Sequence, residues 1–465
     1  MDRLRGALAA GFAKRVQLER RLANPASSSA GRYTGRVPAA PIRNLRWWIG
    51  GLLFASTVIN YIDRQTLSVL APFLMDQYRW TNSDFATIVI AFRISYAVMQ
   101  TVSGRLLDWL GTRRGLSVAV AFYSASAMLT SLAGGLWSFR FFRFLLGCGE
   151  AANWPGATKA VGEWFPDRER GWAVALFDSG SAIGAAVAPS LVVFLYQHFG
   201  SWRPVFVLTG LLGWLWLFAW LRVYHAPAAH PRLGASERRL ILEGSSRPPD
   251  PHRATLGDWA RLLALPQTWG IVAVRAVLDP YWFLMSDWFA IYLVRKGFRL
   301  EDTLAGFWVP FLAADLGNFF GGGLSSWFIR RGLPVLEARR RAFFLCAPGM
   351  LAMLPVTQLD RFPALIACFA LAMFSYAACA TIYLALPSDL YPNRAVASVS
   401  GLSGTGAGLG TILSTYTIGR VTDATRSFTP IFVGASAAPL LAAAALFRLV
   451  RSMPPSGAPP PTSRT

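Results

Sequence analysis

Charged residues are scarce in this chain. Asp, Glu, Lys and Arg make up only 15% of its 465 residues, whereas a soluble globular domain usually carries about a quarter. Hydrophobic residues account for 54%. This composition excludes an ordinary soluble domain and indicates an integral membrane protein.

Cysteine and histidine are rarer still, with four residues of each. All four cysteines fall inside apolar runs, as small buried residues do, and their spacing matches neither a disulfide framework nor a metal site. The histidines lie at the ends of apolar runs or between them, and no nucleophile constellation accompanies them. We therefore expect no metal, no cofactor and no enzymatic activity.

No long apolar run precedes residue 47, so we expect no secretory signal. Residues 1–45 are polar and basic instead, with consecutive serines at positions 27–29. Two interpretations are open for this segment, a transit peptide and a basic cytoplasmic extension. We favour the cytoplasmic extension.

Apolar segments are abundant, and many approach the ~20 residues that a helix needs to cross a bilayer core of ~30 Å. We predict an all-α integral membrane protein with twelve transmembrane helices in two six-helix halves. The predicted spans are 47–73, 84–107, 116–133, 138–160, 171–196, 204–223, 268–294, 303–329, 341–358, 362–386, 396–419 and 429–449. The predicted parts are a basic extension (1–45), an N-terminal half (46–223), a cytoplasmic linker (224–266), a C-terminal half (267–450) and a disordered tail (451–465).

The distribution of Lys and Arg predicts the orientation. With both termini inside, the inner loops carry more basic residues than the outer loops, but they are also longer. The basic N-terminal segment favours placing both termini in the cytoplasm, in a multi-pass protein of the inner (plasma) membrane. The net charge of +21 then reflects segments that face anionic lipid. We expect the lipid bilayer as partner, no nucleic acid, and a monomer.

Two predicted spans carry charges at membrane depth, where a charge is costly unless it faces a cavity or a partner. Asp63 and Arg64 lie deep in span 1, and Arg143 and Glu150 lie about two turns apart on one face of span 4. One alternative is that span 1 ends early and leaves its charges at the interface. Another is that the charges form a structural ion pair between the two spans.

The same charges could bind and couple substrates. An arginine fork can donate two parallel hydrogen bonds to a carboxylate, and a buried carboxyl group can exchange protons. We group them as two acid–arginine sets, Asp63 with Arg64 and Glu150 with Arg143. Such sets could couple the transport of an organic anion to protons.

The two halves repeat a glycine followed by paired arginines at a turn, in residues 104–115 (GRLLDWLGTRRG) and 323–332 (GLSSWFIRRG). We expect Asp108 in the first segment to interact with the N-terminal end of a neighbouring helix. A plain positive-inside turn is the alternative for the second segment. Matching turns in a six-plus-six layout favour a transporter built from repeats.

Residues 104–115 resemble the signature between spans 2 and 3 of the major facilitator superfamily. Other segments resemble its anion:cation symporter branch, and within that branch the hexuronate and sugar-acid transporters. These segments are 60–68 (NYIDRQTLS), 143–155 (RFLLGCGEAANWP), 163–170 (EWFPDRER), 279–282 (DPYW) and 387–392 (PSDLYP). The resemblance covers nearly all of residues 45–450.

The resemblance implies roles for individual residues. Those matching Arg64 and Arg143 hold the substrate carboxylate in the family, and those matching Asp63 and Glu150 carry protons. Tyr96 matches a tyrosine of the family's site, and Ser181 occupies a position that often donates a hydrogen bond to substrate. From the residues themselves, Tyr61 lies beside the face of span 1 that carries the charges, and Trp282 could stack on a sugar ring or pack against lipid.

Some residues depart from the family's pattern. Arg93, Asp178 and Asp287 are charged where we expect apolar or neutral side chains, and Asp315 and Asn318 also lie at depth in span 8. The three departing charges could pair with one another or reshape the site.

The predicted function is a proton-coupled symporter for a small organic anion, a hexuronate or related sugar acid. The alternative is a membrane ligand sensor built on a transporter fold, which would not need two proton-carrying acids. A membrane-embedded enzyme lacks any supporting constellation.

Overall fold

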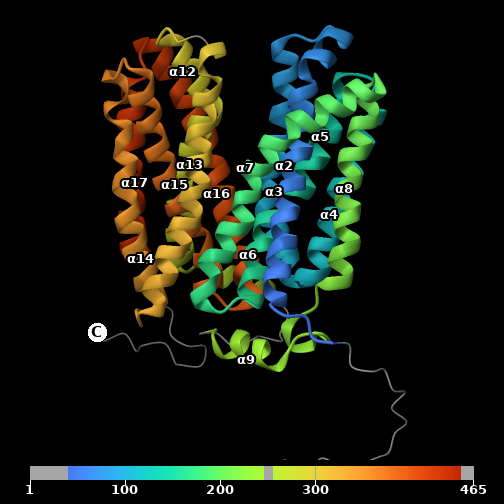
Figure 1. Ribbon diagram of the computed structural model, residues 1–465, viewed down its shortest axis with the longest axis vertical. Coiled ribbons are helices and arrows are strands. Elements are labelled where there is room, and N and C mark those ends of the chain that lie inside the picture. The colour runs from blue at the N-terminus through green and yellow to red at the C-terminus, as the bar shows by residue number, and fades with distance from the viewer. Residues whose placement is uncertain (1–39, 246–254, 299, 452–465) are drawn as a thin grey trace, which may run out of the picture. The chain divides into compact units, whose positions relative to one another are not determined.

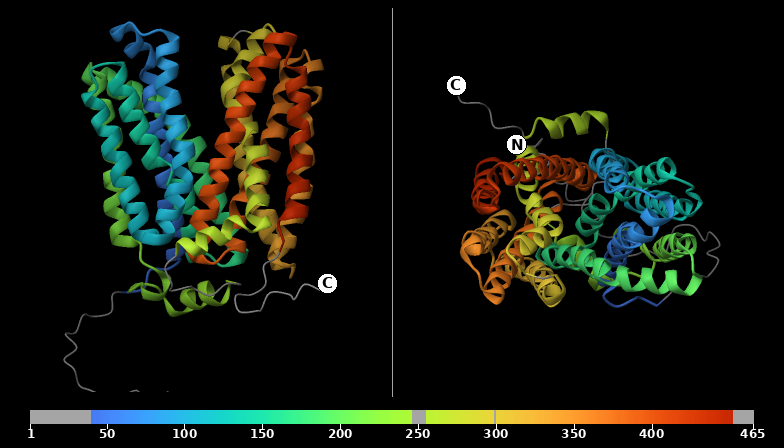
Figure 2. Two further views of the ribbon diagram at one scale, coloured as in Figure 1. Left: turned by 180° about the vertical axis from the view of Figure 1, so that it is seen from behind. Right: turned by 90° about the horizontal axis from the view of Figure 1, so that it is seen from above.

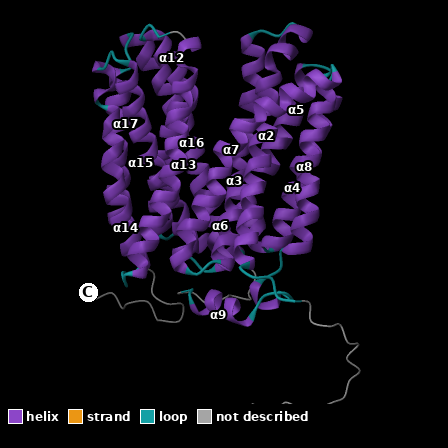
Figure 3. Ribbon diagram, viewed as in Figure 1, coloured by secondary structure: helices purple, strands orange, loops and turns teal. Residues whose placement is uncertain are grey.

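The computed structural model describes residues 40–245, 255–298 and 300–451, and the regular structure in these ranges is helical throughout. Figure 3 shows helices joined by loops, and the described residues form no strand beyond an isolated bridge between Ile42 and Leu233. Residues 1–39 of the predicted extension, 246–254 of the predicted linker and 452–465 of the predicted tail lie outside these ranges.

The helices follow the predicted spans in order, and Figures 1 and 2 show them in two groups. The first group contains α2 (Leu45–Tyr78), α3 (Asn82–Leu110), α4 (Thr112–Leu129), α5 (Leu136–Glu150), α6 (Asn153–Trp164), α7 (Asp167–Phe199) and α8 (Trp202–Val223). The second group contains α11 (Pro266–Phe283), α12 (Phe289–Arg295), α13 (Leu300–Arg330), α14 (Val335–Cys346), α15 (Phe362–Leu390), α16 (Asn393–Thr425) and α17 (Thr429–Leu449).

Seven of the described helices are long and apolar enough to cross a membrane by themselves, and the bent pair α10–α11 would add an eighth. The other spans are less apolar or are interrupted. Helix α2 carries charges near its middle, and α5 is separated from α6 by a turn at residues 151–152. The fold is that of a multi-pass helical membrane protein.

Two predicted spans are interrupted at prolines. Pro280 in α11 is followed by a π-helical segment, Leu284–Trp288, before α12 continues the span. After α14, the chain continues as short 3₁₀ helices that contain Pro348 and Pro355. Proline lacks a backbone N–H and clashes with the preceding turn, so it weakens an α-helix near its position.

Helix α2 decides between the alternatives for the first span. It runs without a break from Leu45 to Tyr78, and Asp63 and Arg64 lie near its middle. The prediction that span 1 could end early is therefore wrong. Both charges lie deep in a membrane-spanning helix.

The two groups meet where small residues allow close contact. Helix α3 packs along α16, and α7 packs along α13. A Cβ atom added at Gly104 of α3 would lie 2.2 Å from the carbonyl oxygen of Ala397, and one added at Gly171 of α7 would lie 2.7 Å from that of Gly322. Glycine permits this approach of two backbones in a membrane.

Buried charges join the groups at the end of the molecule next to the linker, which we call the linker side. Asp108 accepts hydrogen bonds from the backbone N–H of Ser398 at 2.7 Å and from Lys159 at 2.6 Å. The predicted contact of Asp108 with a helix N-terminus is thereby confirmed. Asp389 of α15 bonds to Arg170 of α7 at 3.3 Å and to Arg339 of α14 at 2.8 Å.

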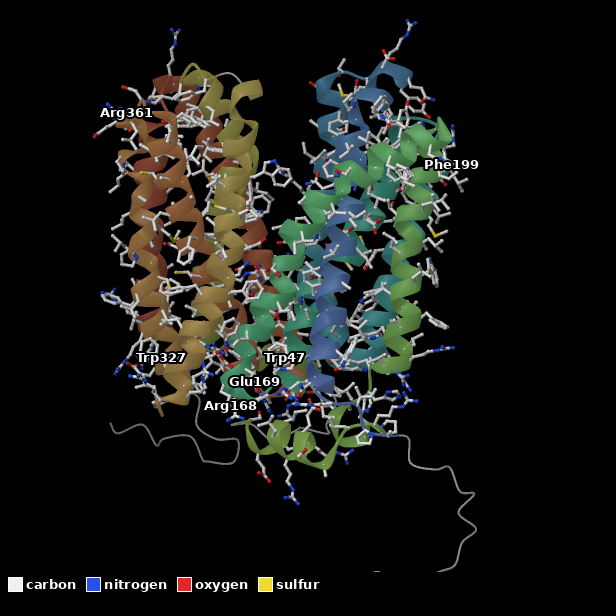
Figure 4. All side chains as sticks on the ribbon, viewed as in Figure 1. Trp47, Arg168, Glu169, Phe199, Trp327 and Arg361 are labelled. Atoms are coloured by element: carbon white, nitrogen blue, oxygen red, sulfur yellow. The ribbon has the colours of Figure 1, made fainter. Side chains whose placement is uncertain are left out.

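The linker contains two helices, α9 (Ala235–Glu243) and α10 (Leu256–Leu263). Glu237 of α9 accepts hydrogen bonds from the backbone N–H groups of Leu45 and Arg46, so it caps the start of α2. Arg46 also bonds to Glu169 at 2.6 Å. Figure 4 shows Trp47 and Glu169 at the linker side, near α9, and Phe199 and Arg361 at the opposite end.

Candidate functional site

An ion pair between α2 and α5 lies at the centre of the first helix group. Nε of Arg64 donates a hydrogen bond to Oε2 of Glu150 at 2.6 Å. The Glu150 side chain is fully buried, and that of Arg64 is 21% exposed. A pair buried to this degree requires close geometry, because desolvation of both charges opposes it.

Aromatic rings surround the guanidinium of Arg64. Its central carbon lies 4.4 Å from the ring centroid of Tyr96, 5.1 Å from Phe92, 5.2 Å from Tyr61 and 5.8 Å from Trp154. Rings at this distance stabilise a cation in a water-poor setting. They also fix the direction in which the guanidinium can meet a carboxylate.

Arg143 and Asp63 are arranged differently. Arg143 is buried and donates to the backbone carbonyl of Arg64 at 3.1 Å and more weakly to that of Asp63 at 3.5 Å. Asp63 is 2% exposed, and neither carboxylate oxygen has a hydrogen-bond partner among the described residues. The sequence paired Asp63 with Arg64 and Glu150 with Arg143, but the structure pairs Arg64 with Glu150. The physical reason is that consecutive helical residues point in different directions, so Arg64 faces α5 and cannot pair with Asp63.

Trp154 connects this ion pair to Asp178 of α7. Its indole N–H donates to Oδ1 of Asp178 at 3.1 Å. Ser181, one turn later, donates to the backbone carbonyl of Asp178 at 2.7 Å and is mostly buried. The predicted positions at Tyr61, Tyr96, Ser181 and Asp178 therefore lie around Arg64 or one side chain away from it.

Three predicted charges depart from the family's pattern, namely Arg93, Asp178 and Asp287. They do not form a cluster around Asp178. Asp178 bonds to Trp154 and forms no ion pair with any described residue. Arg93 lies with its guanidinium 5.9 Å from the ring of Phe283 in α11. Asp287 falls in the π-helical segment, and its side chain lies outside the described part of the structure.

The second helix group supplies a polar cluster that the sequence did not single out. Arg275 of α11 bonds to Asp279 at 2.8 Å and to Ser403 of α16 at 3.3 Å. The hydroxyl of Tyr383 in α15 donates to the other oxygen of Asp279. The spacing of Arg275 and Asp279, i and i+4 in an apolar run, was the available signal.

Side chains from both groups meet between these clusters. Tyr96, beside Arg64, lies within electrostatic range of Arg275, and Asp178 lies within the same range of Arg275 and Asp279. Trp282 contacts Phe311 and Tyr376 in its own group, with ring centroids 5.6 and 6.3 Å away. It is half-buried, so packing accounts for much of its surface.

The side chains of this arrangement are of types that can bind an anion with hydroxyl groups. It offers an arginine fork, buried carboxyl groups and aromatic faces, and it has no ligand set for a metal: the described residues contain no group of three or more His, Cys, Asp or Glu side chains that could hold a metal ion. A single cation that can be released from its carboxylate is suited to binding a carboxylate.

Comparison with known proteins identifies the family. The family model of the Major Facilitator Superfamily matches residues 53–415. The hexuronate transporter of Escherichia coli K12 is 31% identical over 421 residues, which cover 89% of this chain and 96% of that protein. The galacturonate transporter of Dickeya chrysanthemi is 34% identical over 289 residues, covering 62% of this chain and 83% of that protein.

Among solved structures, the proton:xylose symporter XylE superposes with a TM-score of 0.66 at 13% sequence identity, covering 88% of this chain and 96% of that one. At this identity the likeness concerns the fold alone. The sequence relatives are named as transporters. This chain therefore belongs to the Major Facilitator Superfamily and is a membrane transporter.

Proposed function

We propose that this protein is a proton-coupled symporter that carries a small organic anion, a hexuronate or related sugar acid, by alternating access. The observation that carries the proposal is the ion pair between Arg64 and Glu150 inside a ring of aromatic side chains. The names of the relatives, which are hexuronate and galacturonate transporters, support a sugar acid as substrate.

The ion pair suggests how the anion and the proton are coupled. When Glu150 takes up a proton, it no longer holds the charge of Arg64, and a substrate carboxylate can take its place on the guanidinium. At this ion pair the uptake of one proton accompanies the binding of one anion, so the pair does not gain net charge. Release of the proton restores the ion pair and expels the anion.

Asp63 has the second proton-carrying role in this proposal. An ionised carboxylate without a hydrogen-bond donor would cost several kcal/mol at this depth, and the oxygens of Asp63 have none among the described residues. The geometry therefore suits a protonated Asp63. Arg143 would turn from the backbone carbonyls to the substrate as the second carboxylate clamp.

Four further predicted residues would complete the substrate site. Tyr61 and Tyr96 would hold the sugar by their rings and hydroxyls, as would Trp282 from the second helix group. Ser181 would donate a hydrogen bond when it releases the carbonyl of Asp178.

Alternating access requires that the two halves separate at one end at a time. We place the halves at residues 46–223 and 267–450, with both termini and the linker on the cytoplasmic side of the inner membrane. The bonds of Asp108 to Ser398 and of Asp389 to Arg170 then close the cytoplasmic side in this structure, and they must break for release. One chain contains the complete site, in keeping with a monomer.

Uptake into proteoliposomes tests the proposal. Purified protein should accumulate labelled D-galacturonate or D-glucuronate against its gradient when an inward proton gradient is imposed, and a proton ionophore should abolish this. Glu150→Gln should lose uphill accumulation and keep anion exchange, whereas Glu243→Gln in the exposed part of α9 should behave as wild type. Unchanged uphill uptake by Glu150→Gln would contradict the coupling role.

A further inference from the structure

Asp178 is a carboxylate near the site that no cation neutralises by direct contact. It lies on α7 and is half-buried, and it accepts a hydrogen bond from the indole N–H of Trp154 at 3.1 Å. The described residues place no Lys or Arg nitrogen within ion-pair distance of it. Asn318 of α13 also interacts with this carboxylate, whose two oxygens can accept further hydrogen bonds from a ligand.

Trp154 fixes the position of Asp178 relative to Arg64. The same indole ring lies 5.8 Å from the guanidinium of Arg64 and donates its N–H to Asp178. One aromatic ring therefore separates the two charges. A six-carbon acid whose carboxylate is held by Arg64 extends into the field of Asp178.

Arg275 is the cation that could offset this charge, but its hydrogen-bonding groups are already engaged. Nε and Nη2 bond to Asp279 at 3.2 and 2.8 Å, and Nη1 bonds to Ser403 at 3.3 Å. The residue is only 7% exposed. Because its direct partners are Asp279 and Ser403, Arg275 forms no ion pair with Asp178 and offsets its charge only from a distance.

Asp315 of α13 adds a second carboxyl group near Asp178. It is half-buried and lies within electrostatic range of Asp178. The two ends of the proposed site therefore differ in charge. The guanidinium of Arg64 lies at one end, and the carboxyl groups of Asp178 and Asp315 lie at the other. Carboxylates at the far end suit the hydroxyls of a sugar, which donate hydrogen bonds, and repel a second carboxylate.

We propose that Asp178 makes this site selective for sugar acids with a single carboxylate, and that it excludes dicarboxylic sugar acids. Asp178 accepts a hydrogen bond from a hydroxyl at the end of the substrate remote from its carboxylate. In a dicarboxylate, that end is an anion that faces Asp178 at short range. This inference rests on the proposed function, since it assigns the far end of a substrate whose carboxylate is bound at Arg64.

Competition in proteoliposomes tests this selectivity. Unlabelled D-galacturonate and its dicarboxylic counterpart, galactarate, compete for uptake of labelled D-galacturonate. In the wild type, we expect galactarate to compete at least about tenfold more weakly. Asp178→Asn should reduce this difference by about tenfold or more, and its amide oxygen can still accept the hydrogen bond from Trp154.

Two further variants complete the design. Asp315→Asn should reduce the difference in the same direction and by less, because Asp315 is the more remote charge. Asp423→Asn, at an exposed position near the end of α16, should leave the wild-type difference unchanged.

Equal competition by D-galacturonate and galactarate in the wild type would overturn the proposal, and this result requires no variant to fold. An unchanged difference between the two acids in a folded Asp178→Asn protein would also overturn it. If the wild type takes up neither acid and neither competes, the proposed function itself fails. That result is distinct from uptake of D-galacturonate without discrimination, which overturns the selectivity alone.

Discussion

Arg64 and Glu150 are 86 residues apart in the chain, and their side chains meet at 2.6 Å across two helices. Helix α2 contributes the cation and α5 the acid, directly before the turn that separates α5 from α6. Any change in the charge of Glu150 therefore changes what Arg64 can bind. The alternative of an ion pair that joins spans 1 and 4 is realised in the structure, and the same pair is the centre of the proposed coupling.

Arg64→Lys tests the need for a planar fork. Lysine keeps the positive charge but cannot donate two parallel hydrogen bonds to one carboxylate. We expect the apparent affinity for D-galacturonate to fall by roughly ten- to a hundredfold, as for a lost charged hydrogen bond of about 1.5–3 kcal/mol. Counterflow measurements in proteoliposomes give this affinity. Arg203→Lys, at an exposed position, is the matched control, and equal affinity in both variants would show that the fork is not required.

Asp389→Asn tests the charges that close the linker side. The Asp389 side chain is 1% exposed and bonds to two buried arginines, Arg170 and Arg339. Removing one partner of a buried ion pair typically costs about 3–5 kcal/mol, because the remaining charges stay buried. We expect a clearly lower thermal unfolding midpoint in detergent.

The same substitution at Asp360 is the control. Asp360 pairs with Lys296 at 3.0 Å, but its side chain is 91% exposed. An exposed pair contributes about 0–1 kcal/mol, so Asp360→Asn should unfold close to the wild-type temperature. Similar midpoints for the two variants would refute a stabilising role for the buried charges.

Gly401→Ala tests the close approach of α3 and α16. A Cβ atom at Gly401 would lie 2.2 Å from the backbone oxygen of Gln100, which cannot move aside without shifting α3. We expect the helices to separate and the uptake rate per reconstituted molecule to fall severalfold. Gly419→Ala lies on the same helix, where an added Cβ meets no atom within 4 Å, and it should transport normally. A normal rate for Gly401→Ala would mean that the contact is not required.

Hydropathy and charge predicted the helices of this protein well, because a membrane span must be apolar over its whole length. The contact of Asp108 with the N-terminal end of α16 was also predictable, since a carboxylate beside a turn glycine is suited to a helix N-terminus. Interruptions within spans were less predictable. The turn after Glu150 has a weak signal in Pro155, which lacks the N–H that would otherwise bond to the carbonyl of Ala151.

The partners of the site residues could not be predicted from one helix at a time. Tyr383 and Asp279 are 104 residues apart and meet only through the packing of α11 against α15. The hydrogen-bond partner of Asp178 is the indole of Trp154 in α6. It is not Arg93, another of the charges that depart from the family's pattern. Helical spacing gives the face on which a residue lies, but tertiary packing decides what that face meets.

The linker contains a histidine that makes its packing sensitive to pH. His230 is 4% exposed, and its Nδ1 accepts a hydrogen bond from the backbone N–H of Arg232 at 3.1 Å. Its Nε2 lies 3.0 Å from the carbonyl of Val223 and must be the donor there, so this ring is neutral. Burial lowers the pKa of His230, and the nearby charges of His225, Arg232 and Arg238 act in the same direction, while the bond to Val223 opposes them.

The sign of the effect follows from this lowered pKa. Above the unfolded value of about 6.5, His230 is neutral whether the linker is packed or open, and pH has no effect through this group. As pH falls below that value, the open linker binds a proton more readily than the packed one, so packing loses stability until the pH lies below the folded pKa. Hydrogen exchange of residues 224–234, corrected for its intrinsic pH dependence, should therefore report more frequent opening at pH 5.5 than at pH 7.5.

His230→Gln should remove this difference, and His198→Gln, at an exposed position, should retain it. Opening that is equally frequent at both pH values in the wild type would contradict the prediction, because a buried neutral histidine that accepts a backbone hydrogen bond cannot be protonated without losing that bond.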